Sequence, residues 1–180
     1  MSFLLNLFKN RVKQVNLTIC GLDKAGKTTL VNYLIHGEFR DTIPTSGMNR
    51  EVLNFPKLQL DIFDLGGQQE FRPMWSDYNE QSDGLIFVVD SSDKARLSES
   101  KEIFYSIINT QINEQIPVLV LLHKADLPNR LKLMEFIKKF GLNNPDLEID
   151  WAIFETSAVT GEGVLDAFHW LVNFFDEGGN

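Results

Sequence analysis

The sequence is poor in cysteine and in long apolar runs, and each shortage excludes a class of protein. Its 180 residues contain one cysteine, Cys20, so no disulfide can form within the chain, and a reducing cytosolic setting is the default. No apolar run reaches the roughly 18 residues that a transmembrane helix needs. A formal net charge of −8 argues against a protein that coats nucleic acid, which needs a basic face. We therefore expect a cytoplasmic protein with no nucleic-acid partner.

Nothing in the sequence divides the chain into several globular domains. It has no internal repeat, no low-complexity linker and no shift in composition, and 180 residues are enough to bury a sizeable core. With 43% hydrophobic and 23% charged residues, it has the composition of an ordinary globular protein and not of a disordered one. We predict an N-terminal amphipathic helix over residues 1–14 and one globular domain over residues 15–180.

The first ten residues, MSFLLNLFKN, have the pattern of an amphipathic helix. At about 100° per residue, the phenylalanines and leucines fall on one arc and the polar residues on the other. Lys9, Arg11 and Lys13 make this end of an acidic chain locally basic. One interpretation is a helix that lies on an anionic membrane surface. The other is a terminal helix packed into a groove of its own domain, and both hold if the helix changes place between two states.

Strands and helices are predicted to alternate along the rest of the chain. Two near-continuous apolar runs, 84–90 and 117–122, are typical of strands buried on both faces of a mostly parallel sheet. The other predicted strands are 15–20, 49–55, 58–63 and 151–156, and the predicted helices are 28–35, 94–110, 131–140 and 162–175. This alternation predicts an α/β fold with a doubly wound, mostly parallel six-stranded sheet flanked by helices. Ligands bind such sheets at the carboxyl ends of the strands.

The segment after the first predicted strand, GLDKAGKT over Gly21–Thr28, matches the phosphate-binding loop GxxxxGK[ST]. Glycines let the backbone curl so that its N–H groups point at phosphate oxygens. Lys27 brings a positive charge to the β- and γ-phosphates, the Thr28 hydroxyl can ligate Mg²⁺, and the following helix adds its positive N-terminal end. The nucleotide-binding residues predicted here are Asp23, Lys24, Ala25, Gly26, Lys27, Thr28 and Thr29.

A second motif, DLGG from Asp64 to Gly67, ends the third predicted strand. A carboxylate at this position lies opposite the phosphate loop and can hold Mg²⁺, directly or through water. The Gly67 amide can bond the γ-phosphate and so sense whether it is present. Gln68 follows at once, where its side-chain amide can orient an attacking water, and we predict it as the catalytic residue.

A third motif, HKAD from His123 to Asp126, ends the fifth predicted strand. Asp126 can accept hydrogen bonds from the guanine N1–H and exocyclic amine, a pair of donors that adenine does not present. The stem of Lys124 can lie along the base. After the sixth strand, Ser157 and Ala158 can offer a backbone N–H to the guanine O6. The three motifs together predict a guanine nucleotide with Mg²⁺ as the ligand.

These motifs, in this order, resemble the Ras-like small GTPases, and their spacing resembles the Arf-like branch. Thr45 precedes Asp64 by 19 residues, the short spacing of Arf-type proteins, and GLDKAGKTT, TIPTSGMN, DLGGQQEFRPMW and SAVTGEGV all resemble Arf-family sequence. The resemblance covers nearly the whole chain. It implies the P-loop small-GTPase fold, Thr45 as a switch threonine that joins Thr28 and Asp64 at Mg²⁺, and Trp75 on a second switch segment.

The same resemblance implies a monomeric GTPase that cycles between GDP and GTP and hydrolyses GTP slowly, on the order of 10⁻⁴ s⁻¹ or below. It implies an exchange factor, a GTPase-activating protein and effectors as partners, and a role in membrane traffic. GTP would expel the N-terminal helix from its groove, so that the protein contacts a membrane peripherally in that state. Two alternatives stay open: a guanine-nucleotide-dependent scaffold with little or no turnover, and a P-loop phosphotransferase that uses ATP.

Three features depart from the Arf pattern. Residue 2 is serine, whereas N-myristoylation needs glycine there, so this modification is excluded. The exposed hydrophobic triad, carried over to Met48, Phe63 and Tyr78, has changed residues at its first two positions, where phenylalanine and tryptophan are usual. His123 replaces the usual asparagine, and an imidazole cannot supply both donors of an amide. We expect guanine selectivity to survive while affinity falls by about 1–2 kcal/mol, the value of one lost hydrogen bond.

Overall fold

The computed structural model describes residues 13–55, 58–113, 115–145 and 147–177. The predicted N-terminal helix therefore lies outside the described residues, apart from its last two positions. Those two, Lys13 and Gln14, belong to the first strand, which begins two residues before the predicted strand 15–20. Within the part of the chain that is described, no helix is long and apolar enough to cross a membrane.

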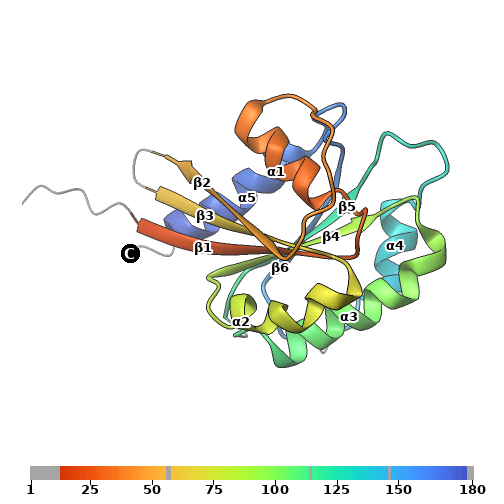
Figure 1. Cartoon of the computed structure of the whole chain (residues 1–180). Coiled ribbons are helices and arrows are strands. Elements are labelled where there is room, and N and C mark those ends of the chain that lie inside the picture. The colour runs from red at the N-terminus through yellow and green to blue at the C-terminus, as the bar shows by residue number, and fades with distance from the viewer. Residues whose placement is uncertain (1–12, 56–57, 114, 146, 178–180) are drawn as a thin grey trace, which may run out of the picture.

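Six strands form one sheet in the order β2-β3-β1-β4-β5-β6 (Figure 1). They are β1 (Lys13–Cys20), β2 (Met48–Asn54), β3 (Leu58–Leu65), β4 (Gly84–Asp90), β5 (Val118–His123) and β6 (Trp151–Thr156). All neighbouring strands pair in parallel except β2, which runs antiparallel to β3 at the edge of the sheet. The predicted doubly wound, mostly parallel six-stranded sheet is confirmed.

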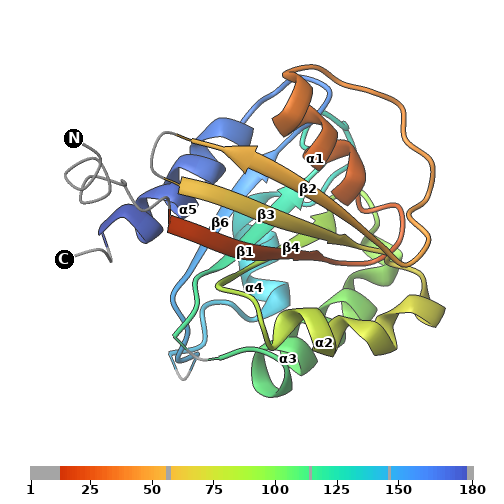
Figure 2. The ribbon, with the colours of Figure 1, turned by 60° about the vertical axis from the view of Figure 1, so that its left-hand side comes forward.

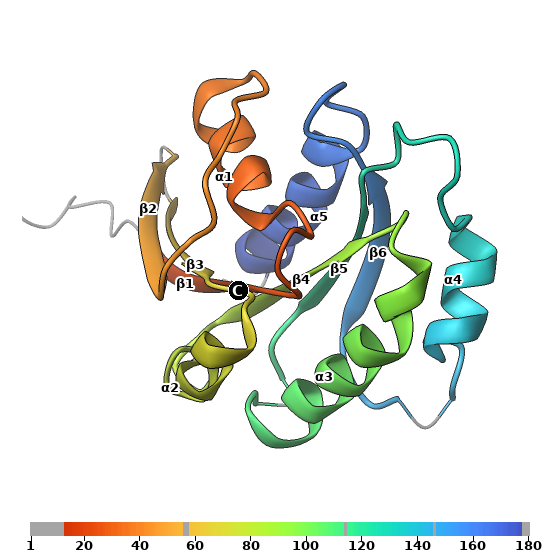
Figure 3. The same cartoon turned by 45° about the vertical axis from the view of Figure 1, so that its right-hand side comes forward.

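Helices cover both faces of the sheet. They are α1 (Lys27–His36), α2 (Trp75–Asn79), α3 (Leu97–Thr110), α4 (Leu133–Phe140) and α5 (Val164–Glu177), with short 3-10 helices over Gln69–Met74 and Lys94–Arg96. In Figure 3, which views the sheet nearly along its edge, α1 and α5 lie above it and α2 and α3 lie below it. The central strands are therefore shielded from water on both sides.

The central strands supply two separate cores because alternate side chains of a strand point to opposite faces. On β4, Ile86 and Val88 pack with α1 and α5, whereas Leu85, Phe87 and Val89 pack with α2, α3 and α4. All five side chains are buried. This explains why the apolar run in β4 is nearly continuous and does not alternate with polar residues.

The structure places a helical segment where none was predicted, from Gln69 to Asn79. It consists of a 3-10 helix that contains Pro73 and the single short helix α2, so it has too few turns to give a helical pattern in the sequence. The segment matters for the site because it directly follows the DLGG motif. Figure 2 shows the connection between α1 and β2 sweeping back to the carboxyl ends of β1 and β3, beside this segment.

Removing the Phe104 ring should destabilise the fold severely. Phe104 is fully buried, with its ring centroid 5.1 Å from that of Phe87 and 5.3 Å from that of Phe140. Phe104→Ala leaves a cavity, and we expect urea denaturation to show a loss of about 3–5 kcal/mol in the free energy of unfolding. Met134→Ala, at a side chain that is 76% exposed on α4, is the control and should change it by less than about 0.5 kcal/mol. A similar small loss for both variants would contradict the packing described here.

Candidate functional site

A cleft of about 230 Å³ opens at the carboxyl ends of β1 and β3. Ten of the predicted site residues line it: Asp23, Lys24, Gly26, Lys27, Thr28, Thr29, Thr45, Gly67, Gln68 and Lys124. Thr42, Ile43 and Pro44 complete the wall and were not predicted. The cleft therefore joins the phosphate loop, the connection from α1 to β2, the DLGG motif and the HKAD motif.

The loop between β1 and α1 needs glycine at its two ends. Gly21 and Gly26 have φ angles of 139° and 100°, in a region that side chains disfavour. A Cβ added at Gly21 would lie 2.2 Å from the carbonyl oxygen of Val88, and one at Gly26 would lie 2.5 Å from Cδ2 of His123. Lys24 also has a positive φ, 63°, without being glycine. The backbone is thus tightly curled, as a phosphate-binding loop requires.

Lys27 holds its ammonium group beneath this curled loop. The side chain is buried, and Nζ donates hydrogen bonds of 2.9 Å to the carbonyl oxygens of Gly21 and Leu22. Burial lowers the pKa of Lys27, and the nearby Asp64 carboxylate opposes that shift. The loop therefore encloses a cation directly below the cleft.

Three oxygen-bearing side chains meet next to Lys27. The Thr28 hydroxyl donates to Oδ2 of Asp64 at 2.5 Å, and the Thr45 hydroxyl lies 2.7 Å from that of Thr28 and 3.2 Å from the same Oδ2. Asp64 is fully buried, and burial raises the pKa of its carboxyl group against the opposing hydrogen bond from Thr28. Its other oxygen, Oδ1, is buried with no hydrogen-bond partner among the described residues.

Mg²⁺ prefers oxygen ligands such as carboxylates and hydroxyls, and it usually takes only a few of its ligands from the protein. This set of oxygens fits that preference. Asp64 Oδ1 is a buried acceptor that a cation or its bound water would satisfy. Elsewhere in the described chain, no group of three or more His, Cys, Asp or Glu side chains is placed to hold a metal ion. Thr28, Thr45 and Asp64 are therefore the residues that would hold it.

Gly66 and Gly67 pack the DLGG motif against its neighbours. The Gly66 N–H donates to the Gly47 carbonyl at 2.7 Å, which ties the motif to the segment that carries Thr45. A Cβ on Gly67 would lie 2.4 Å from the backbone nitrogen of Asp23, so only glycine lets this segment approach the phosphate loop so closely. The buried Trp75 indole donates to the Gly66 carbonyl at 3.0 Å, so its surroundings depend on this motif.

His123 ends β5 as a buried, neutral side chain. Its Nδ1 lies 2.9 Å from the Thr156 hydroxyl, and the opposite edge of the ring abuts Gly26. Burial, with a smaller contribution from Lys124, lowers the pKa of His123 to about 4. One ring nitrogen is thus already occupied by Thr156, and the imidazole has only Nε2 left for a further bond toward the loop.

Lys124 connects two strand ends to the phosphate loop. Its Nζ donates to the Lys24 carbonyl at 2.7 Å and to Oδ2 of Asp90 at 2.6 Å. Burial would raise the pKa of Asp90, but hydrogen bonds from Lys124 and Ser92 outweigh burial and lower it. Sequence reasoning missed Asp90, although its place at the carboxyl end of β4 was a usable signal.

The remaining predicted residues lie beside the cleft and do not line it. Ser157 donates to Oδ1 of Asp126 at 2.6 Å, so the two predicted guanine-reading segments are in contact. Ala158 is buried next to them, and Ala25 is buried on the inner side of the phosphate loop. The structure therefore places the predicted site residues around one region, with a half predicted to hold phosphate (the phosphate-side half) and a half predicted to hold the base (the base-side half), joined by Lys124.

Comparison with known proteins finds similarity to a protein family and to solved structures. The model of the ADP-ribosylation factor family matches residues 1–175. The solved structure of the Arl6 BBS3 small GTPase from Trypanosoma brucei, with bound nucleotide analogue GppNp, is similar at a TM-score of 0.82 and 29% sequence identity. That similarity covers 92% of this chain and 99% of the other.

The buried neutral His123 should make stability sensitive to acid. Its pKa of about 4 in the folded chain is below the ordinary 6.5, so its favourable contribution is complete above pH 6.5 and is lost as the pH falls toward 4. At pH 5 the loss is about 2 kcal/mol relative to pH 7. In urea denaturation, we expect the free energy of unfolding of His123→Asn to fall by about 2 kcal/mol less than that of the wild type between pH 7 and pH 5. Equal pH dependence in the wild-type protein and in His123→Asn would contradict the assignment.

Proposed function

The chain belongs to the ADP-ribosylation factor family and is a small GTP-binding protein, and from this membership we propose that it is a molecular switch that binds GDP or GTP with Mg²⁺ and hydrolyses GTP slowly. The observation that supports this most directly is the meeting of Thr28, Thr45 and Asp64 above the enclosed Lys27. A cation site and a phosphate site side by side are what a magnesium–nucleoside phosphate requires.

Each part of the cleft has a role in hydrolysis. Lys27 and the backbone N–H groups of the loop hold the phosphates, and bound Mg²⁺ would neutralise charge on the phosphate oxygens. Gln68 lines the cleft beside Gly67 on extended backbone, with φ −64° and ψ 148°. Its amide can orient a water for in-line attack on the γ-phosphate. The mechanism would draw an arginine from a GTPase-activating protein, which raises hydrolysis by roughly 10³–10⁵-fold.

The base-side half supports a preference for guanine. Asp126 is positioned by Ser157 and keeps carboxylate capacity to accept from the N1–H and exocyclic amine of guanine. Lys124 stands between this half and the loop, where its stem would lie along the base. His123 is the residue that should lower the nucleotide affinity, because Thr156 occupies one of its two ring nitrogens.

The contacts between the two switch segments support a change of shape with the nucleotide. Thr45 and Gly67 would contact the γ-phosphate side, and the Gly66–Gly47 hydrogen bond makes the two segments move together. On the family pattern, this movement would release the N-terminal helix to a membrane and expose a surface for effectors in membrane traffic. An exchange factor would reload GTP.

Equilibrium binding of labelled GDP and GTP in the presence of Mg²⁺ tests the proposal. Excess unlabelled GTP or GDP should displace the label, and excess ATP should not. Displacement by ATP would instead favour a phosphotransferase. Multiple-turnover phosphate release, with and without cell extract as a source of activating protein, separates a GTPase from a guanine-nucleotide scaffold, which would bind but release no phosphate.

His123→Asn should tighten GDP binding. An asparagine restores a second hydrogen-bond donor at this position, worth about 1–2 kcal/mol, or roughly 5–30-fold in affinity. The selectivity for guanine nucleotides over ATP should stay unchanged, because in our proposal it comes from Asp126. The measurement is GDP affinity and dissociation rate, with the exposed His169→Asn as the matched control. Unchanged affinity and dissociation rate in His123→Asn would show that the histidine costs nothing.

Gln68→Leu should abolish most hydrolysis while leaving nucleotide binding nearly intact. The side chain orients water in our proposal and does not hold the nucleotide, so we expect phosphate release to fall at least about tenfold and GDP affinity to change less than about twofold. Gln69→Leu is the matched control, since its exposed side chain lies outside the lining of the cleft. If both variants hydrolysed GTP at the wild-type rate in the presence of extract, Gln68 would not be the catalytic residue.

A further inference from the structure

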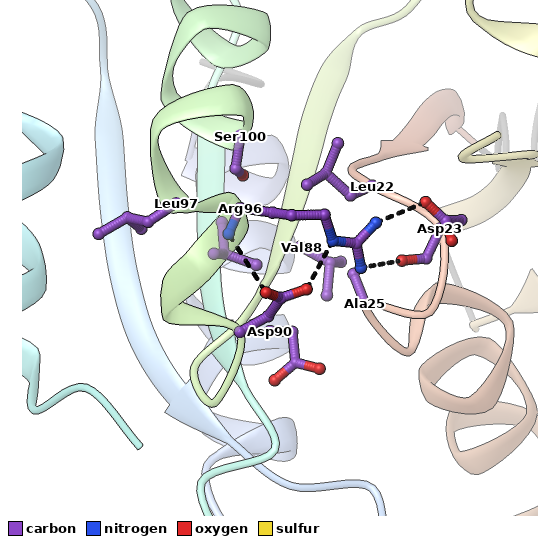
Figure 4. A pocket seen from close by; sticks show the side chains of 10 residues that line it. Leu22, Asp23, Ala25, Val88, Asp90, Arg96, Leu97 and Ser100 are labelled. Carbon is purple, nitrogen blue, oxygen red and sulfur yellow. Dashed lines mark hydrogen bonds and ion pairs between the residues drawn. The ribbon is translucent and has the colours of Figure 1, made fainter. Parts of the chain in front are cut away.

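Arg96 is not among the residues that line the cleft, but it binds the phosphate loop directly. Its guanidinium donates from Nη1 to Oδ1 of Asp23 at 2.7 Å and from Nη2 to the main-chain carbonyl oxygen of Asp23 at 3.1 Å. Figure 4 shows the arginine reaching from the start of α3 across to Asp23. The two residues are 73 positions apart in the sequence, so this contact joins the loop after β1 to the connection after β4.

The other side of the guanidinium is fixed to its own connection. Nε donates to Oδ2 of Asp93 at 2.6 Å, and Oδ1 of the same carboxylate accepts from the Arg96 backbone N–H at 3.2 Å. Asp93 therefore caps the turn that begins at Lys94 and also orients the arginine. A planar guanidinium with bonds on both sides is a rigid bridge, which the point charge of a lysine cannot reproduce.

The space between the loop and α3 is a packed contact and not a ligand pocket. Its cavity measures about 10 Å³, about the room that one water needs. Leu22 and Ala25 from the loop and Leu97 and Ser100 from α3 line it together with Arg96. This contact therefore has no room for a ligand of its own, and we look for its effect in the phosphate loop that it touches.

The bond to the Asp23 carbonyl sets the direction of a phosphate-binding N–H. The chain has no cis peptide among the described residues, so each carbonyl points opposite to the N–H of the next residue. Because Arg96 binds the Asp23 carbonyl, the N–H of Lys24 points away from Arg96, and Lys24 is one of the residues that line the cleft. The next carbonyl, that of Lys24, is held in turn by Lys124 at 2.7 Å.

We propose that Arg96 is a positioning residue of the phosphate loop, which orients the Lys24 N–H toward the nucleotide phosphates by holding the Asp23 carbonyl on the opposite side. The inference rests on the nucleotide binding proposed above. It explains why two consecutive carbonyls of the loop are bound by cations, Arg96 and Lys124. Arg96 is anchored on Asp93, just after β4, and Lys124 is anchored on Asp90, at the end of β4.

The test compares the dissociation of labelled GDP from the full chain and from four variants. We expect Arg96→Ala to release GDP about tenfold faster, because a charged hydrogen bond that organises the loop is lost. Arg96→Lys should release it about threefold faster, since an ammonium reaches Asp23 but cannot bridge to Asp93. Asp23→Ala should have a smaller effect than Arg96→Ala, because it removes the carboxylate and leaves the carbonyl contact.

Arg50→Ala is the fourth variant and the matched control. Arg50 forms a 2.9 Å ion pair with the buried Asp61 across β2 and β3, with no contact to the phosphate loop, and its loss should change GDP release less than about twofold. A second measurement is phosphorus NMR of bound GDP, because the chemical shifts of the phosphates report the loop geometry and not the overall stability of the protein. We expect the phosphate resonances to shift in Arg96→Ala and to stay in place in Arg50→Ala.

Each outcome decides between loop positioning and its rivals. Wild-type release rates and phosphate resonances in Arg96→Ala would overturn the inference while leaving the proposed function intact. Equally fast GDP release from Arg50→Ala would also overturn it, because the loss of any ion pair would then be enough to speed GDP release. If Arg96→Ala did not fold, the comparison of Arg96→Lys with Arg50→Ala would decide in the same way. Failure of the wild-type chain to bind GDP would refute the proposed function, and this inference with it.

Discussion

The carboxylate of Asp64 is the point on which the site depends. It is fully buried at the carboxyl end of β3, and it binds the hydroxyls of Thr28 and Thr45, which come from two other segments. A buried carboxylate is costly unless it is hydrogen-bonded or paired with a cation. Since Oδ1 still has no partner among the described residues, the fold leaves one strong acceptor for a ligand at this place. The same carboxylate joins the segments of the site and leaves the acceptor that a bound Mg²⁺ would satisfy.

Parallel strand order makes this convergence possible. β1, β3, β4 and β5 run in the same direction, so the segments after each of them meet at one edge of the sheet. Asp64, Asp90, His123 and Lys124 all stand at or just after such a strand end. One buried core on each face of the sheet packs against these strands and holds their ends in place.

This order also explains how much the sequence could predict. Apolar runs and short motifs of glycine, lysine and carboxylate are visible in a sequence because they are local. The six strands, and ten of the residues that line the cleft, could therefore be predicted. What the sequence could not show was pairing between motifs. Nothing near Arg96 or Thr156 indicates a partner, because Asp23 and His123 lie 73 and 33 positions away. The short helical segment after Gln68 was missed because it has too few turns for a periodic pattern.

An acidic chain with a net charge of −8 must still bind an anion, and the local pairing of charges resolves this conflict. Lys27 lies near Asp64, Lys124 bonds to Asp90, and Arg96 bonds both Asp23 and Asp93. The two outer cations use their acidic partners as anchors and bind carbonyl oxygens of the loop, so they act on phosphate through the direction of backbone N–H groups. Lys27 is enclosed by the loop and lines the cleft, and Lys24 and Lys124 line it as well. Phosphate affinity in this protein thus depends on backbone geometry held by ion pairs, which does not require a basic surface.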